Sequence, residues 1–580
     1  LEVPETVDGD GNFLPHVPLF AGKNVFDAND DIADKLAEAS GLLARGEVMH
    51  TYPHSWRSKA PLIFRNTPQW FISMETNELR RKALAAIDRV RWVPPSARNR
   101  IYGMVEERPD WVVSRQRAWG VPLPVFVDRK TGEILRDPAV LERVAAAVAA
   151  DGADVWFVSE PKRFLGSDYD GRAYEKVEDI LDVWFESGST HSFVLETRPD
   201  LEWPASLYLE GSDQHRGWFH SSLLEACGTR GEAPYEAVLT HGFVVDAEGR
   251  KMSKSLGNVI APQEVMDEYG ADILRIWAVS ADYAEDLRIS KEILDYQADG
   301  YRRLRNTYRY LLANLAGFKP EERLAHEEMP PLERWVLHRL VELDALVRRS
   351  CEAFDFHPLF TALHNFCAVD LSAFYFDVRK DSLYCDRPDS ARRRAARTVM
   401  DALFSCLTAW LAPIICFTTE EAWLHRYPDE EGSVHLRLFP ELPGRWRDDA
   451  LADNWEKARR LRRVVTGALE VERREKRIGS SLDAHPTVYA PGEHVAAMDG
   501  VALAEIAITS AATLMEGEPP SEAFTLDEVP GVGVVAGLAE GRKCDRCWQV
   551  LTEVGSLPAH ADLCRRCADA VDALAAGSAT

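Results

Sequence analysis

The pattern of apolar and polar residues predicts a strand, a helix and a second strand in the first half of the chain. A short apolar run covers residues 207–209 and stops at Gly211, a helical pattern follows over 218–226, and a second apolar run covers 237–245. This order predicts parallel strands, because a helical crossover returns the chain in the same direction. Ligands of open parallel sheets bind beyond the carboxyl ends of the strands, so residues 211–215 are expected at a binding site.

Beyond this segment the apolar pattern becomes helical. Pro262 stands where a helix is expected to begin, and Gly270 interrupts it. Apolar residues then recur at three- and four-residue steps over 293–315, 332–354, 359–376, 391–411 and 455–471. Short polar or proline-containing links join these segments, which predicts a helical bundle. An earlier amphipathic helix is expected over 31–43.

After about residue 481 the apolar runs become short. The sequences PTVYA, EIAITSA and VGVVAGL have the length and composition of strands. They predict a small mixed domain between the bundle and the carboxyl terminus.

Length and composition indicate a multidomain globular protein. A chain of 580 residues exceeds what one hydrophobic core supports, and three to five domains are expected. No uninterrupted apolar run approaches the roughly 20 residues of a membrane span, and no signal peptide heads the sequence. We therefore expect a cytoplasmic protein without membrane contact. We also expect a monomer. The sequence opens in mid-pattern at Leu1 instead of Met, which suggests a fragment of a longer protein.

The formal net charge of -25 argues against indiscriminate nucleic-acid binding, but one segment reverses the sign. Residues 457–477 carry nine basic residues against only three acids. A charged run on a helix is most often a solvated face, and that alternative stays open. In a chain this acidic, the run is the best candidate for phosphate contacts that position a nucleic acid, through Arg459, Arg462, Arg463, Arg473 and Arg474.

Two short motifs suit a nucleotide. KMSKS, residues 251–255, places two lysines and two hydroxyls in a turn between a strand and a helix, where they can close on a polyphosphate. In GSDQH, residues 211–215, Gly211 admits a ligand close to the backbone, and Asp213 can accept ribose hydroxyls. The alternatives are an exposed solubilising turn for KMSKS, and a helix cap formed by Ser212 or Asp213.

The carboxyl-terminal cysteines predict a metal site. Cys544 and Cys547 form one CxxC pair, and Cys564 and Cys567 form a second, with sixteen residues between the two pairs. Two such knuckles fit a closed tetrahedral Zn²⁺ site, which is structural because no position stays open for a substrate. A disulfide pair or an iron site is the alternative. The other six cysteines lie scattered among apolar residues, as reduced core thiols do.

Together these motifs resemble the class I aminoacyl-tRNA synthetases, and within them the branch specific for isoleucine. The resemblance extends from about Gly9 to Cys567. KMSKS and GSDQH belong to the class generally, whereas YLEGSDQHRGWF, LDVWFESGSTHSF, FRNTPQWFISM, SRQRAWGVPLP, LTHGFVVDAEGRKMSKSLGN and the cysteine module resemble the isoleucine branch. The valine branch usually differs in the DVWF segment and lacks the terminal metal module.

The resemblance implies roles for individual residues. It assigns Glu210 to the isoleucyl-adenylate and Lys254 to ATP, with Lys251 assisting at the phosphates. Gly211, Asp213 and Gln214 would line the adenylate site. Trp218 and Trp184 resemble aromatic walls of the amino-acid pocket, and ordinary buried core tryptophans are the alternative for both.

The resemblance also implies the fold class and the reaction. The fold is α/β plus all-α: an incomplete Rossmann-type catalytic domain, a helical anticodon-binding domain and a small zinc module. The reaction is ATP-dependent activation of L-isoleucine and transfer to tRNA(Ile), with Mg²⁺ accompanying ATP and one structural Zn²⁺. The expected divisions are 1–50 for the end of the editing domain, 51–260 for the second part of the catalytic domain, 261–300 for connective helices, 301–480 for the anticodon-binding domain, 481–540 for a small mixed region and 541–580 for the zinc module.

Two features of the family are missing from this sequence. The HIGH tetrapeptide is absent, and so is most of the domain that edits valine. Two functional hypotheses of different classes follow: an isoleucine-specific enzyme of which this chain is a part, or a tRNA-binding and zinc-binding portion without catalytic activity by itself. A valine- or leucine-specific relative is a third reading.

Overall fold

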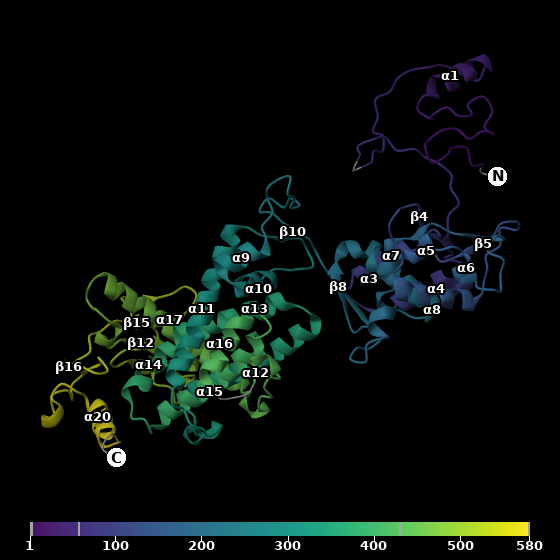
Figure 1. Ribbon diagram of the computed structural model, residues 1–580. Helices are drawn as coiled ribbons and strands as arrows, with labels where there is room; N and C mark the ends of the chain where they lie inside the picture. Colours follow the sequence, from purple (N-terminus) through teal and green to yellow (C-terminus); the bar gives the residue numbers. More distant parts are fainter. Residues whose placement is uncertain (1–3, 56–57, 429–431, 578–580) are drawn as a thin grey trace. The chain divides into compact units, whose positions relative to one another are not determined.

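The computed structural model describes residues 4–55, 58–428 and 432–577, and the chain divides into two compact units, Leu1–Thr240 and His241–Thr580 (Figure 1). Each unit has its own hydrophobic core. The two units are therefore described one at a time.

The first unit begins with one short helix. Helix α1 covers Asn29–Glu38, so the predicted extent of 31–43 is wrong at its end. The chain leaves the helix at Ser40, which has a φ of 56°, and the Gly41 N–H bonds back to the Leu36 carbonyl at 2.8 Å. A left-handed residue followed by such a bond is a common helix stop. The apolar residues after Gly41 therefore lie outside the helix.

A three-stranded sheet carries the expected strand, helix and strand. Its order is β2 (Arg91–Val93), β9 (Ala237–His241) and β8 (Tyr208–Gly211), and β2 pairs with β9 in parallel. A parallel bridge joins Ala205 to Tyr235 just ahead of β8 and β9. Helix α8 (Trp218–Thr229) is the crossover between them, which confirms the predicted order.

The apolar run 237–245 is nevertheless not one strand. Strand β9 ends at His241, and Val244–Val245 form β10, which pairs in parallel with β11 (Leu287–Arg288). The break falls at Gly242, whose N–H bonds the Tyr283 carbonyl at 2.9 Å. A Cβ at this position would lie 2.7 Å from the Asp286 nitrogen, so only glycine allows the two backbones to approach. The prediction of a single strand is wrong because this contact comes from residues 40 positions away.

The remaining elements of the first unit surround this sheet and a small insertion. The helices are α2 (Leu79–Ile87), α3 (Ala97–Glu106), α4 (Pro138–Asp151), α5 (Val155–Val158), α6 (Lys162–Leu165) and α7 (Val183–Gly188). The short strands pair as antiparallel ribbons: β1 (Phe71–Ile72) with β3 (Trp111–Val112), β4 (Ser114–Arg115) with β7 (Ile180–Leu181), and β5 (Phe126–Asp128) with β6 (Tyr174–Lys176). The insertion buries its own aromatic cluster around Trp156.

The second unit contains the predicted helical bundle. Helices α9 (Pro262–Tyr269) and α10 (Ala271–Val279) meet at Gly270, whose φ is 88°. The bundle then contains α11 (Lys291–Leu315), α12 (Pro331–Ala353), α13 (Phe356–Asn365), α14 (Phe376–Cys385), α15 (Ala391–Leu411), α16 (Cys416–Arg426) and α17 (Asp449–Arg474) (Figure 1). All five predicted helices are present. Helix α16 was not predicted.

One stretch of the bundle has the length and apolarity of a membrane span. A π-helical segment, Phe366–Tyr375, connects α13 to α14 and makes Phe356–Cys385 one continuous helix. Within its most apolar window, 56% is buried inside the protein. Packing in the bundle core accounts for this composition.

The small mixed domain contains a four-stranded sheet. Its order is β13 (Thr513–Glu516), β12 (Thr487–Ala490), β15 (Gly533–Val535) and β14 (Phe524–Thr525). Helices α18 (Gly492–Ala496) and α19 (Leu503–Ala507) accompany it, so the strand predicted for EIAITSA is wrong. Leu503, Ile506 and Ala507 are buried on one face of a helical turn, which ends at Ile508 with a φ of 58°. The last elements are β16 (Arg542–Lys543), β17 (Val550–Leu551) and α20 (Arg565–Gly577).

Candidate functional site

The residues predicted at the strand end form a tight turn in the first unit. Strand β8 ends at Gly211, and Ser212–Arg216 form a single 3-10 turn before α8 begins at Trp218. Glu210 is exposed, and its carboxylate accepts the Gly211 N–H at 3.1 Å. Gln214 donates to Asp213 at 3.2 Å and accepts the Trp218 N–H at 3.0 Å. Neither Ser212 nor Asp213 caps a helix, so that alternative is wrong, and Gln214 takes the place of a cap.

Both predicted tryptophans lie at the contact between α7 and α8. The Trp218 ring stacks on Tyr208 at a centroid distance of 4.0 Å, and its indole N–H donates to the Ser187 carbonyl and the Thr190 hydroxyl, both at 3.1 Å. Trp184, which is 40% exposed, lies against the backbone of Gly217, where a Cβ would stand 2.7 Å from the indole. Gly217 therefore lets the Trp184 ring reach the turn that carries Gln214. The sequence reading did not single out this glycine.

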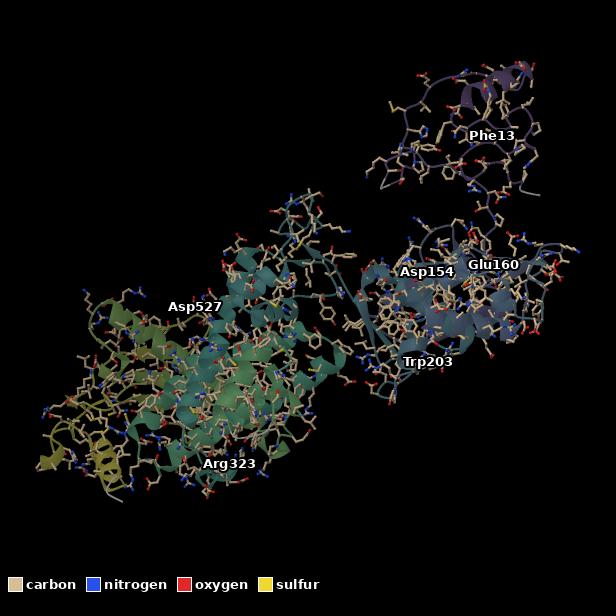
Figure 2. All side chains as sticks on the ribbon, in the orientation of Figure 1. Phe13, Asp154, Glu160, Trp203, Arg323 and Asp527 are labelled. Atoms are coloured by element: carbon tan, nitrogen blue, oxygen red, sulfur yellow. The ribbon has the colours of Figure 1, made fainter. Side chains whose placement is uncertain are left out.

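The segment that carries Trp184 is held at both ends. At its start, the Asp182 carboxylate accepts the Trp184 N–H at 3.3 Å and pairs with Arg115 at 2.8 Å. Beyond its end, Trp203 (labelled in Figure 2) donates its indole N–H to His191 at 3.1 Å. The backbone of Trp184 is thus held by a polar contact, while its ring is too exposed to be an ordinary core tryptophan.

His215 belongs to the motif but not to its exposed face. Its ring is buried, donates through Nδ1–H to the Ser212 carbonyl at 2.6 Å, and stacks on Trp92 with an interplanar angle of 26°. Burial lowers the pKa of His215. A neutral, enclosed imidazole supports the turn and is not placed to exchange protons with a ligand.

The KMSKS loop lies in the second unit and is anchored at its base. Asn258 accepts the Ser253 N–H at 2.9 Å and donates to the Asp246 carboxylate at 2.9 Å. These bonds, with those from Arg250, lower the pKa of Asp246 to about 2. Lys251 and Lys254 are exposed, and among the described residues neither ammonium has an ion-pair partner in the structure. The loop thus presents two uncompensated positive charges, which fits binding of a polyphosphate.

Helix α8 also buries a carboxyl group, that of Glu225, against α7. The Glu225 side chain packs on the backbone of Gly188, where a Cβ would lie 2.9 Å from the carboxyl carbon. Its Oε1 has no hydrogen-bond partner among the described residues, and burial raises the pKa of Glu225 to about 9. Glu225 is therefore protonated at neutral pH, and the contact of α7 with α8 depends on that neutral form.

Replacing Glu225 by Gln is expected to make the first unit more stable at alkaline pH. The folded pKa lies above the ordinary value of 4.5, so the stability that Glu225 contributes is complete below about pH 4.5 and is lost as the pH rises toward 9. The loss amounts to about 1.4 kcal/mol per pH unit. The free energy of unfolding is measured with urea and tryptophan fluorescence at pH 6 and pH 8.5. It should fall less between these two pH values for Glu225→Gln than for the parent. Exposed Glu232→Gln is the matched control, and identical pH dependence in all three proteins would contradict the prediction.

The four carboxyl-terminal cysteines form a compact metal-ligand set. All four are buried, and their sulfur atoms lie within 4.8 Å of one another. The Cys547 and Cys564 sulfurs are 3.8 Å apart, and the Cys564 N–H points to the Cys544 sulfur at 3.3 Å. Four thiolates at these separations fit a tetrahedral Zn²⁺, and backbone N–H donors to the sulfurs are typical of such knuckles. The donor set has no open position, so the zinc is structural.

Arginines between the cysteine ligands attach this module to the bundle, which sequence reasoning missed. Arg546, inside the first knuckle, donates to the carbonyls of Tyr384 (2.8 Å) and Cys385 at the end of α14. Arg566, inside the second, pairs with Asp381 and with Asp386 (3.1 Å). The sequence signal for this contact was an Arg at the second variable position of each CxxC pair.

The basic run 457–477 lies on α17 and just beyond it, with its arginines in different environments. Arg459 pairs with Asp370 at 2.9 Å and lies over Trp335, and Arg462 donates to the Ile506 carbonyl at 2.7 Å. Burial lowers the pKa of Arg462. Arg463, Arg473 and Arg474 are exposed or peripheral, with Arg463 paired to Glu528 at 3.5 Å and Arg473 to Glu470. The outer three are the better placed for phosphate contacts.

Comparison with protein families defines the class. The model for class I tRNA synthetases (I, L, M and V) matches residues 7–290, that for the anticodon-binding domain of tRNA ligases matches 333–488, and that for the zinc finger found in FPG and IleRS matches 541–570. The chain belongs to the class I tRNA synthetases. The predicted fold class, with its zinc module, is confirmed.

Within that class the similar proteins are isoleucine–tRNA ligases. The enzyme of Caulobacter vibrioides is 54% identical over 98% of this chain and 60% of its own length, and that of Gluconobacter oxydans is 52% identical over 99% and 60%. The chain thus spans about 60% of the length of these relatives. Among solved structures, methionyl-tRNA synthetase of Mycobacterium tuberculosis in complex with methionyl-adenylate has a TM-score of 0.46 and 17% identity, covering 66% of this chain and 72% of that one. A likeness at this level carries no argument about the site.

Proposed function

We propose that this chain provides the adenylate-binding and tRNA-binding parts of an isoleucine–tRNA ligase. Two segments carry the proposal: the turn 210–214 at the end of β8, and the KMSKS loop, whose two lysines have no ion-pair partner within the described part of the chain. The identity to isoleucine–tRNA ligases over nearly the whole chain supports it.

The proposed reaction needs no protein nucleophile. The carboxylate of L-isoleucine attacks the α-phosphate of ATP, a P–O bond forms, and the bond to pyrophosphate breaks. A ribose hydroxyl of the terminal adenosine of tRNA(Ile) then takes the acyl group and AMP leaves. Mg²⁺, when bound with ATP, neutralises phosphate charge. Catalysis rests on positioning and on stabilising charge that develops on the phosphates.

Different residues of this chain have different roles in the proposed reaction. Glu210, Gly211, Asp213 and Gln214 hold the isoleucyl-adenylate, and Trp184 and Trp218 border the amino-acid side chain. Lys251 and Lys254 carry their charge to the leaving pyrophosphate from a loop whose base is fixed by Asn258 and Asp246. The outer arginines of α17 and the residues that follow it contact the tRNA backbone. We place the protein in the cytoplasm, as a monomer without membrane contact.

A second function applies to the 580 residues by themselves. The sequence contains no HIGH tetrapeptide, and the chain covers 60% of its relatives. As an isolated polypeptide it would bind tRNA and zinc without activating isoleucine or editing valine. Isoleucine-dependent exchange between ATP and pyrophosphate separates the two functions, since a normal rate with these 580 residues alone would overturn the second.

Lys254→Ala is expected to lower the exchange rate by about a hundredfold or more, because it removes a charge aimed at the transition state. The measurement uses a chimera in which the Caulobacter vibrioides relative supplies the segments that this chain does not match. Lys130→Ala, in an exposed turn of the first unit, is the control and should leave the rate unchanged. Equal rates for both variants would remove Lys254 from the reaction.

A further inference from the structure

A small cavity in the first unit gathers arginines that the proposed reaction does not use. It has a volume of about 270 Å³, and Arg108, Arg115 and Arg216 line it together with Asp110, Asp182 and His220. Three arginines and two aspartates thus line one cavity. This local excess of positive charge is notable in a chain whose formal charge is -25.

Both carboxylates of the cavity already have partners. Asp182 pairs with Arg115 at 2.8 Å and accepts the Trp111 indole N–H at 3.2 Å. Asp110 accepts the Met74 N–H at 2.8 Å. Arg115 is therefore the one arginine of the three that the carboxylates neutralise directly.

Among the described residues, neither Arg108 nor Arg216 forms an ion pair, although the charge of Asp182 lies near enough to Arg108 to favour its charged form. The Arg108 guanidinium lies over the Trp111 ring at 5.5 Å, and its Nε is buried and has no hydrogen-bond partner among the described residues. Burial lowers the pKa of Arg108, which means that the folded protein holds this charge at a cost. Arg216 is exposed at the rim, and the described part of the chain gives its side chain no ion pair. Both arginines line the same cavity.

The uncharged lining residues and the volume of the cavity limit the size of the ligand. His220 contributes no charge near neutral pH, because burial and the nearby Arg108 lower its pKa to about 3. Trp184 and Gly217, which the candidate adenylate site also uses, form part of the lining. The volume lies below that of typical ligand pockets, so the cavity suits a single small group and not a nucleotide or an amino acid.

We propose that this cavity binds a phosphate group through Arg108 and Arg216, with Arg115 held in place by Asp182. Guanidinium groups match the geometry of phosphate oxygens and form two hydrogen bonds at once, which favours phosphate over a spherical anion. The phosphate comes either from a free ion, such as inorganic phosphate or pyrophosphate, or from a phosphodiester of RNA. The cavity shares Trp184 and Gly217 with the candidate adenylate site, but its arginines have no role in the proposed reaction.

The test measures binding directly on the 580-residue chain. Equilibrium dialysis with radiolabelled pyrophosphate, and ³¹P NMR line broadening with inorganic phosphate, should show saturable binding in the parent. Arg216→Ala should weaken it at least tenfold without affecting folding, because the side chain is exposed. Arg216→Lys keeps the charge but loses the two parallel donors of the guanidinium group. Its affinity should therefore lie between those of the parent and Arg216→Ala. Arg108→Ala should also weaken binding, with its fold checked by circular dichroism.

Controls and competition identify the source of the phosphate. Arg198→Ala removes an exposed arginine of the same unit that pairs with Asp200 at 2.9 Å, and it should bind as the parent does. Displacement of pyrophosphate by tRNA, lost in Arg216→Ala, assigns the site to a phosphodiester, whereas binding of the free ions without displacement assigns it to those ions. Absence of saturable binding, or equal binding by the parent, Arg216→Ala and Arg108→Ala, would overturn the proposal.

Discussion

Cys564→Ser is expected to abolish zinc binding and to release the carboxyl-terminal module from the bundle, while the helices of the bundle stay folded. A tetrahedral thiolate site loses its closed geometry when one ligand is removed, and structural zinc contributes about 10 kcal/mol or more to the folding of such a module. The local core consists mainly of the cysteines themselves, with Val554. Little apolar burial remains to hold the module together without the metal.

Loss of zinc should also affect the end of α14, because the cysteine module contacts this helix. Arg546 and Arg566 lie inside the two knuckles and bind the last turn of α14 and the residue after it. Without zinc the knuckles no longer hold these arginines in position. Hydrogen exchange should therefore accelerate at residues 381–386 as well as in the module, and metal analysis should fall from one zinc per chain to about none.

Two further variants separate metal binding from attachment. Arg566→Ala keeps all four thiolates, so it should retain zinc but lose protection at 381–386. Cys416→Ser replaces a partly exposed cysteine at the start of α16 and should change neither readout. Normal zinc content in Cys564→Ser, or unchanged exchange at 381–386 in both module variants, would contradict the account.

The sequence pattern predicted those elements that depend only on residues close together in the chain. The helix at 391–411 has the predicted limits, and Pro262 and Gly270 begin and separate two helices as expected. The cysteine set follows from spacing alone, because each CxxC turn delivers two thiolates. In these helices the apolar residues repeat over enough turns to distinguish a helix from a strand.

The parts that were missed depend on contacts between distant residues. The run 237–245 breaks at Gly242 because the backbone of residues 283–286 approaches it. The segment at 503–507 is too short for its period to distinguish a helical turn from a strand. In the site, the motifs supplied Glu210, Gln214 and the lysines, but not the anchors that position them. Gly217 and Asn258 act through neighbours that only the fold reveals.

Arg379→Leu is expected to destabilise the second unit by about 3–5 kcal/mol, because it leaves a buried carboxylate without its partner. Arg379, on α14, is 1% exposed and binds both oxygens of Glu333 on α12, at 2.5 and 2.6 Å. Glu333 is fully buried, and Tyr375 donates to the same carboxylate at 3.2 Å. Arg379 also reaches Glu505 of α19 at 2.7 Å, so one side chain connects the bundle to the small domain.

The double variant Glu333→Leu with Arg379→Leu should recover most of that stability. Replacing both charges by apolar side chains removes the cost of an unpaired ion, and buried pairs often tolerate such replacement. Urea unfolding followed by circular dichroism at 222 nm gives the comparison. Arg387→Ala, which removes an exposed arginine paired with Asp389 at 3.0 Å, is the control and should shift stability by no more than about 1 kcal/mol. A single variant as stable as the parent, or a double variant as unstable as the single one, would show that the ion pair of Glu333 with Arg379 does not stabilise the bundle.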